Sequence, residues 1–193
     1  MSLVVPGESY HESFLAALHE FHEEGELLDV RLADVTEPAA FRDWLEHLRR
    51  DGLRGTAVTA RDRTAHRVYW WVEDRQFLGR ARLDLRLTPE LTEFGGHIGY
   101  DIRPTARGRG HATALLRAVL GMAHEAGLDR ALLTCAPDNH ASRRVIERNG
   151  GVLMDTSAAG RLRYWCPTVP PGAAPRAGGP ATRSPRKTGG ATS

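Results

Sequence analysis

The stretch HIGYDIRPTARGRGHATALL near the middle of the chain constrains the fold more than any other segment. Apolar and polar residues alternate over 97–103, as in a strand, and Pro104 ends the alternation because proline cannot donate to a strand ladder. After a glycine-rich turn over 107–112, apolar residues recur with helical spacing over 108–126, and Gly127 is placed as the stop. The sequence therefore predicts a strand, a tight turn and a long helix in direct succession.

The turn between that strand and that helix has the composition of an anion-binding loop. Gly108, Gly110 and the small Ala112 let the backbone approach a ligand without a side chain in the way. The first N–H groups of a helix have no partner inside the helix and, together with the helix dipole, favour negative charge at the same point. The loop is therefore predicted to bind a phosphate or pyrophosphate group.

Two common nucleotide-binding motifs fit this loop poorly. A Walker loop would end in Gly-Lys-Ser or Gly-Lys-Thr, which the chain lacks. A Rossmann site would place a third glycine where Thr113 stands and its ribose-binding acid at the end of the second strand, whereas Asp129 precedes that strand. A glycine-rich turn that only starts a helix is the structural alternative to a binding loop.

The rest of the pattern indicates a mixed α/β (α+β) domain with helices on a central sheet. Two amphipathic helices come first, over 9–24 and 36–51. Ser9 and Glu12 have the spacing of a capping box, and Thr36 is placed to cap the second helix. The later elements expected from periodicity are strands over 66–72, 80–86, 130–135, 152–155 and 162–165 and a helix over 139–149.

Length and charge narrow the class of protein. The 193 residues suffice for one domain of ordinary size. The net charge is +2, but the four charged residues of 168–193 are all basic, which leaves 1–167 at −2 and argues against a dedicated nucleic-acid-binding domain. The segment 168–193 is dominated by Pro, Gly, Ala, Ser and Thr, so we expect a disordered tail, with contact to nucleic acid as a weaker alternative.

Nothing in the sequence indicates export or insertion into a membrane. The first residues lack a basic segment followed by an apolar one, and nowhere do eighteen apolar residues run together. The two cysteines, Cys135 and Cys166, do not make the framework of a secreted disulfide scaffold. A cytoplasmic protein is therefore expected.

The residues of the loop resemble the GNAT superfamily of acetyl-CoA-dependent N-acetyltransferases, whose pyrophosphate loop reads Gln/Arg-x-x-Gly-x-Gly/Ala. The resemblance continues in the segments 138–142 and 147–151 and covers about 66–166, most like a bacterial branch of predicted acetyltransferases. It implies a mostly antiparallel central sheet with helices on both faces and a splayed parallel strand pair, 97–103 and 130–135. The implied layout is one domain over 1–167, with a helical N-terminal part (1–52) and a motif-bearing core (66–166), followed by the tail.

The same resemblance implies acetyl-CoA as cosubstrate and no metal. The pyrophosphate would lie on the loop, and the pantetheine arm would be bonded to the backbone near Ile102 and held by Asn139 and Ser142. The loop residues that match the motif are Arg107, Gly108, Arg109, Gly110, His111 and Ala112.

An amine would attack the thioester directly, with a base that removes its proton. His97 is the preferred base, because many members carry a glutamate ten residues before the loop and an imidazole titrates near neutrality. Glu93 is the alternative base. The structural alternative for His97 is a side chain that only makes hydrogen bonds inside the sheet. Ile146 stands where many members have a tyrosine as general acid, so that role is not carried over, and His140, Ser142 and Tyr164 are substitutes.

The acceptor stays open between a small-molecule amine and a peptide amine, and the aromatic residues 69–71 are candidates for the wall of its pocket. The isoleucine at the acid position also keeps a second class open, a non-catalytic acyl-CoA-binding or regulatory module. A homodimer is compatible with either reading, although one chain sequence does not display symmetry.

Overall fold

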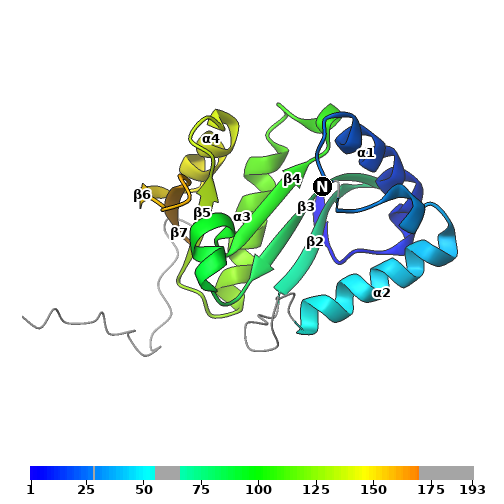
Figure 1. The fold of residues 1–193 in the computed structure, drawn as a ribbon, viewed down its shortest axis with the longest axis horizontal. Helices are drawn as coiled ribbons and strands as arrows, with labels where there is room; N and C mark the ends of the chain where they lie inside the picture. Colours follow the sequence, from blue (N-terminus) through cyan, green and yellow to red (C-terminus); the bar gives the residue numbers. More distant parts are fainter. Residues whose placement is uncertain (28, 55–65, 170–193) are drawn as a thin grey trace, which may run out of the picture.

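The computed structural model describes residues 1–27, 29–54 and 66–169, and for 51–54 it describes the backbone only. Its first sheet is antiparallel throughout, in the order β1-β2-β3-β4 (Figure 1). The strands are β1 (Ser2–Val4), β2 (His66–Glu73), β3 (Gln76–Asp84) and β4 (Ile98–Ile102). The second sheet has the order β5-β7-β6, also antiparallel, from β5 (Arg130–Cys135), β6 (Val152–Thr156) and β7 (Leu162–Pro167).

Helices cover both faces of the first sheet. On one face lie α1 (His11–Glu23) and α2 (Pro38–Arg54), and on the other lies α3 (His111–Glu125). Helix α4 (His140–Arg148) packs against α3 and β5, and short helical turns occur at Glu8–Tyr10, Leu32–Asp34, Leu91–Gly95 and Pro104–Ala106. Strand β2 shows the division: Tyr69 and Trp71 join the core under α3, whereas the alternating Trp70 and Val72 join the core under α1 and α2. The predicted mixed α+β fold with helices on both faces is confirmed.

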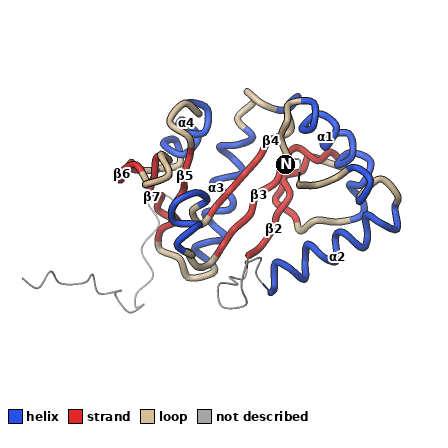
Figure 2. Tube along the Cα trace, in the orientation of Figure 1, coloured by secondary structure: helices blue, strands red, loops and turns tan. Residues whose placement is uncertain are grey.

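Among the described residues, backbone pairing joins the two sheets only directly before β4, and the sheets then diverge (Figure 2). Gly96 and Leu133 form one isolated bridge of antiparallel type, and the N–H of His97 donates to the carbonyl of Leu132 at 2.7 Å. A Cβ on Gly96 would come within 2.3 Å of that carbonyl oxygen, and its φ is +71°, so glycine is required there. Past this point no ladder joins β4 to β5 among the described residues, which leaves one edge of β4 open, as the predicted splay requires.

Some local predictions of helix starts are wrong. Helix α1 begins at His11 after a 3₁₀ turn, and no side chain caps it, so the Ser9 capping box does not form. The hydroxyl of Thr36 donates back to the Leu32 carbonyl instead of capping α2. Helix α4 is capped by a side chain, because Asn139 Oδ1 accepts from the N–H of Ser142 at 2.9 Å.

The end of the described chain is anchored to the second sheet. Thr168 is buried, and its N–H donates to the carbonyl of Asp129. The expected disordered tail therefore starts after this residue at the earliest, and 170–193 lie outside the described residues. Within the described part, no helix is both long and apolar enough to cross a lipid bilayer.

Candidate acetyl-CoA cleft and adjoining site

The loop between β4 and α3 owes its shape to two glycines. Gly108 and Gly110 have φ of +75° and +84°, in the left-handed region. A Cβ at either would meet nothing within 4 Å, so the backbone conformation and not close packing requires glycine. Gly110 is the N-cap of α3, and the first free N–H groups of that helix therefore lie at the end of the loop.

This loop forms the floor of a cleft of about 410 Å³, called the loop cleft below. One wall is β4 from Tyr100 to Ile102, and the other is one face of α4 from Ala141 to Arg148. The predicted binding residues that line it are Ile102, Arg107, Gly108, Gly110, His111, Ala112, Asn139 and Ser142. Arg109 is exposed and does not line it.

Acids from the N-terminal part pair with Arg107. Its Nε donates to the Ile102 carbonyl at 3.0 Å, and its Nη1 and Nη2 lie 2.5 and 2.6 Å from carboxylate oxygens of Glu24 and Glu26. Glu26 also lines the cleft. The guanidinium is thus held in place by two carboxylates, and the three groups together carry a net charge of −1.

Helix α4 adds two cations that the sequence analysis did not identify. Arg144 and Arg148 line the loop cleft, are exposed, and have no polar partner among the described residues. Their spacing of four on one face of a helix was the available signal. The loop cleft therefore presents free helical N–H groups and two unpaired guanidinium groups, which suits a phosphorylated ligand.

A second cleft of about 560 Å³ adjoins the first. Aromatic side chains of the N-terminal helices and β2 line one part of it, and Arg80, Arg82 and Arg161 line others. The residues that both clefts share are Tyr100, Asp101, Asn139 and Ser142. These four residues, called the junction, mark where a ligand in one cleft meets a ligand in the other.

The junction holds a hydroxyl pair and a carboxylate. Tyr100 Oη lies 2.9 Å from Ser142 Oγ, and burial raises the pKa of Tyr100 to about 12, so the phenol stays protonated near neutrality. Asp101 accepts from Arg80 Nε at 3.0 Å. The sequence analysis missed Tyr100 and Asp101, although Asp101 has the same strand parity as His97.

His97 is buried directly before β4, where the two sheets meet, and lines neither cleft. Its Nδ1 accepts from the N–H of Leu132 at 2.9 Å, so a neutral ring carries its proton on Nε2, and a second proton would break this bond. Burial lowers the pKa of His97, against the opposite effect of Asp84. This geometry matches a histidine that serves the fold through its hydrogen bonds, and the role of His97 as catalytic base stays a prediction.

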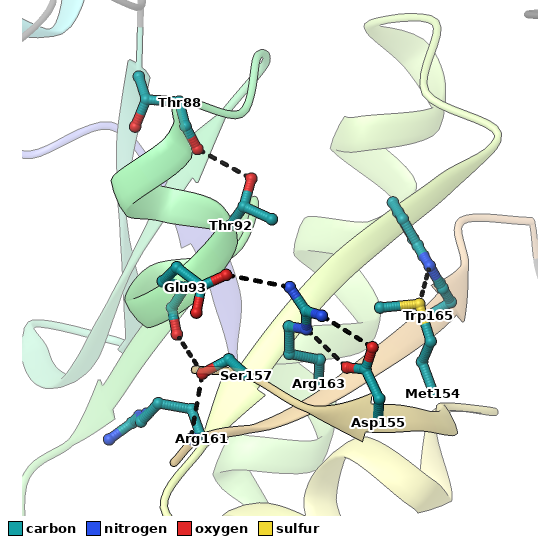
Figure 3. Close-up of polar contacts among 9 residues, drawn as sticks. All are labelled: Thr88, Thr92, Glu93, Met154, Asp155, Ser157, Arg161, Arg163 and Trp165. Carbon is teal, nitrogen blue, oxygen red and sulfur yellow. Dashed lines mark hydrogen bonds and ion pairs between the residues drawn. The ribbon is translucent and has the colours of Figure 1, made fainter. Parts of the chain in front are cut away.

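Glu93 lies on the turn Leu91–Gly95, also outside both clefts (Figure 3). Its Oε1 is 3.3 Å from Arg163 Nη1, and its carbonyl accepts from Ser157 Oγ at 3.1 Å. Its contacts tie the turn to the β6–β7 hairpin. Ile146 is fully buried in the core, and no group of three or more potential metal ligands occurs among the described residues.

The comparison with protein families decides the assignment. The model of the GNAT acetyltransferase domain matches residues 10–152. The chain belongs to the GNAT acetyltransferase family. This GNAT domain is therefore an acyltransferase, and the expected family and enzyme class are confirmed.

Solved structures share the fold of this GNAT domain at low identity. RimJ from Mycobacterium smegmatis, solved with a CoA disulfide, is 18% identical with a TM-score of 0.60, over 86% of this chain and 80% of that one. An acetyltransferase from Salmonella typhimurium that modifies the N-terminal serine of a 50S ribosomal subunit protein is 18% identical (TM-score 0.55; 86% and 93%). A chimera of spermidine N-acetyltransferase SpeG from Vibrio cholerae and hSSAT is 13% identical (0.56; 87% and 97%). No curated protein matches the chain in sequence.

Proposed function

We propose that this GNAT domain transfers the acetyl group of acetyl-CoA to an amine by direct attack in a ternary complex. The observation that carries the proposal is the meeting of two clefts at the junction, beside the open edge of β4. A loop cleft for the cofactor and a second cleft for the amine would bring the two substrates together there. The similarity to RimJ, solved with a CoA disulfide, supports this use of the loop cleft.

The cofactor would be held mainly through its phosphates. The pyrophosphate would lie on the loop Arg107 to Ala112, where the first N–H groups of α3 are free, with Arg144 and Arg148 as additional cations. The pantetheine arm would run along the open edge of β4 near Ile102, with the Asn139 amide beside it. Arg109, which does not line the loop cleft, stays a predicted cofactor-binding residue.

The chemistry would need one proton acceptor and one proton donor. The amine nitrogen bonds to the thioester carbon, N–H groups of β4 polarise the carbonyl oxygen, and the C–S bond breaks to release the CoA thiolate. Asp101 is the carboxylate at the junction and would take the proton of the amine. The Tyr100 and Ser142 hydroxyl pair would return a proton to the thiolate.

Asp101 takes this role in the proposal ahead of His97 and Glu93, which line neither cleft. The acceptor is proposed as a small-molecule or peptide amine, in line with the named activities of the Salmonella and Vibrio relatives. A cytoplasmic location and a homodimer stay predictions.

The test is ligand-induced thermal stabilisation followed by turnover. Acetyl-CoA or CoA at about a hundred times its dissociation constant should stabilise the protein by about 2.7 kcal/mol, whereas NAD should not. Gly110→Asp places a charge in the loop and should abolish the shift. Gly127→Asp is the matched control, because Gly127 has φ +93° and open space around it but lines neither cleft.

Turnover then separates an enzyme from a binding module. Release of free CoA thiol that depends on an added amine supports the transferase. Stabilisation by CoA without such release across primary amines would favour the non-catalytic acyl-CoA module. No stabilisation by either CoA ligand, in folded protein, would overturn the proposal.

A further inference from the structure

Of the three arginines that line the second cleft, two are paired with acids and one is not. Arg80 is paired with Asp101 at 3.0 Å, and Arg82 makes a bidentate pair with Asp84 at 2.8 Å. The guanidinium of Arg161 has no acidic partner among the described residues, and its Nε is buried without a hydrogen-bond acceptor. A buried donor without an acceptor is costly, so this group is suited to receive one from a ligand.

Backbone hydrogen bonds hold Arg161 in a fixed position directly before β7. The N–H of Arg161 donates to Ser157 Oγ at 3.2 Å, and its carbonyl accepts from the N–H of Ser157 at 2.8 Å. Its side chain extends away from the ion pair of Arg163 with Asp155 (Figure 3). The position of the side chain therefore does not result from the hairpin's own salt bridges.

Arg161 lines the same cleft as the four residues of the junction. Cys135, at the end of β5, lines the same cleft, and the positive charge of Arg161 counteracts the rise that burial causes in the pKa of its thiol. Asn139 of the junction follows Cys135 by only four residues. An amine at the junction could therefore carry a second group that reaches Arg161.

The remaining polar groups of the cleft favour an oxygen-bearing ligand. The indole N–H of Trp70, on the wall of the cleft, is likewise buried without an acceptor. Of the two acids that line the cleft, Asp101 is paired with Arg80, and Asp29 is exposed, where water weakens its attraction for a cation. The groups that lack partners inside the cleft are thus hydrogen-bond donors.

We infer that the acceptor is an amine that also carries an anionic oxygen group, a carboxylate or a phosphate, which Arg161 binds. This inference rests on the proposed transferase function and narrows its acceptor. A guanidinium binds either group through two parallel hydrogen bonds, whereas it repels a polyamine. Binding through Arg161 would hold the amine at the junction for attack.

The experiment compares acceptors that differ only in the anionic group. One pair is the dipeptide amides Ser-Asp and Ser-Asn, the other is phosphoethanolamine and ethanolamine, and spermidine is the cationic acceptor. Release of CoA thiol gives kcat/KM for each. We expect kcat/KM to be at least tenfold higher for the anionic member of at least one pair. The pair with the larger ratio shows whether Arg161 binds a carboxylate or a phosphate.

Two variants then assign the preference to one side chain. Arg161→Gln should reduce the preference to less than threefold, mainly through KM. Arg163→Gln is the control, since it makes the same change two residues further along the chain, in β7, on a residue that does not line the cleft. Equal use of both members of each pair, or an unchanged preference in Arg161→Gln, would overturn the inference while leaving the transferase intact.

If turnover is too slow to measure kcat/KM, the binding of the reaction products tests the same inference. With CoA bound, the N-acetylated products of the preferred pair should raise the melting temperature only for the anionic member and only when Arg161 is present. If CoA binds but no amine in the panel is acetylated and no product binds, the proposed function and this inference both fail.

Discussion

At the scale of single residues, His97 shows how a buried titratable side chain next to a strand can stabilise the fold. We predict that His97→Asn, whose side-chain oxygen can still accept from the N–H of Leu132, keeps kcat within a few fold. His97→Leu leaves that N–H unpaired and should cost about 1–3 kcal/mol in the free energy of unfolding, measured in urea. A loss of kcat of about a hundredfold in His97→Asn would instead support the predicted base.

The same residue gives a pH dependence with a defined sign. Because burial lowers the pKa of His97 in the folded protein, the unfolded chain binds the proton more readily. The stability that this residue contributes is therefore present above its unfolded pKa of about 6.5 and is lost as pH falls through the lower folded value. Urea unfolding between about pH 7.5 and 5 should show this loss in the wild type and less of it in His97→Asn.

Tyr100 is the residue whose neutral form the proposed chemistry uses. Tyr100→Phe removes the proton donor but keeps the ring, so we expect kcat to fall by about tenfold or more while acetyl-CoA affinity changes little. Burial raises its pKa to about 12, so the wild-type rate should show no decline from this group below about pH 10. An unchanged kcat in Tyr100→Phe would remove the hydroxyl pair from the mechanism.

At the scale of elements, the strands and helices that are specified by a local sequence pattern could be predicted from the sequence. Strand β5 was predicted residue for residue from its apolar run before Pro137, and α4 was predicted to within one residue at each end. Strand β1 was missed, because three residues that pair with β2 across about seventy positions carry no periodic pattern. The contact of Tyr100 with Ser142, 42 residues apart, depends on how β4 and α4 pack, which no local pattern specifies.

Helix α4 carries a prediction of its own. Replacing both Arg144 and Arg148 with Glu reverses two charges on the loop cleft and should weaken acetyl-CoA binding by about tenfold or more. Arg117→Glu, an exposed change on α3 away from both clefts, should have little effect. Calorimetric titration at two salt concentrations checks this, and an equal loss in the control would show only a nonspecific effect of net charge.

At the scale of the whole molecule, the N-terminal helical part is connected to both clefts. Aromatic residues of α1 and α2 line the second cleft, and acids at and beyond the end of α1 reach the cofactor loop. Glu20 accepts hydrogen bonds from Arg103 and from Thr105, which precede that loop. Although burial raises the pKa of Glu20, these contacts lower it overall. The helical part therefore helps to position the loop.

This connection predicts that the N-terminal part restrains cofactor affinity. In the free protein, Glu24 and Glu26 neutralise Arg107, and Glu26 puts a negative charge on a wall that phosphates would approach. Changing both to Gln should therefore tighten acetyl-CoA binding by about two- to fivefold, equivalent to about 0.4–1 kcal/mol, and lower stability by a similar amount as two exposed ion pairs are lost.

The control for that change is Glu23→Gln, an adjacent exposed acid that pairs with no described residue and lines neither cleft. Titration at low and moderate salt should show the gain in affinity for the double variant and almost none for the control, with the difference shrinking as salt screens it. Weaker binding in the double variant would mean that the two carboxylates hold Arg107 in the orientation the cofactor needs. The N-terminal part would then act by ordering the loop, and the electrostatic restraint would be excluded.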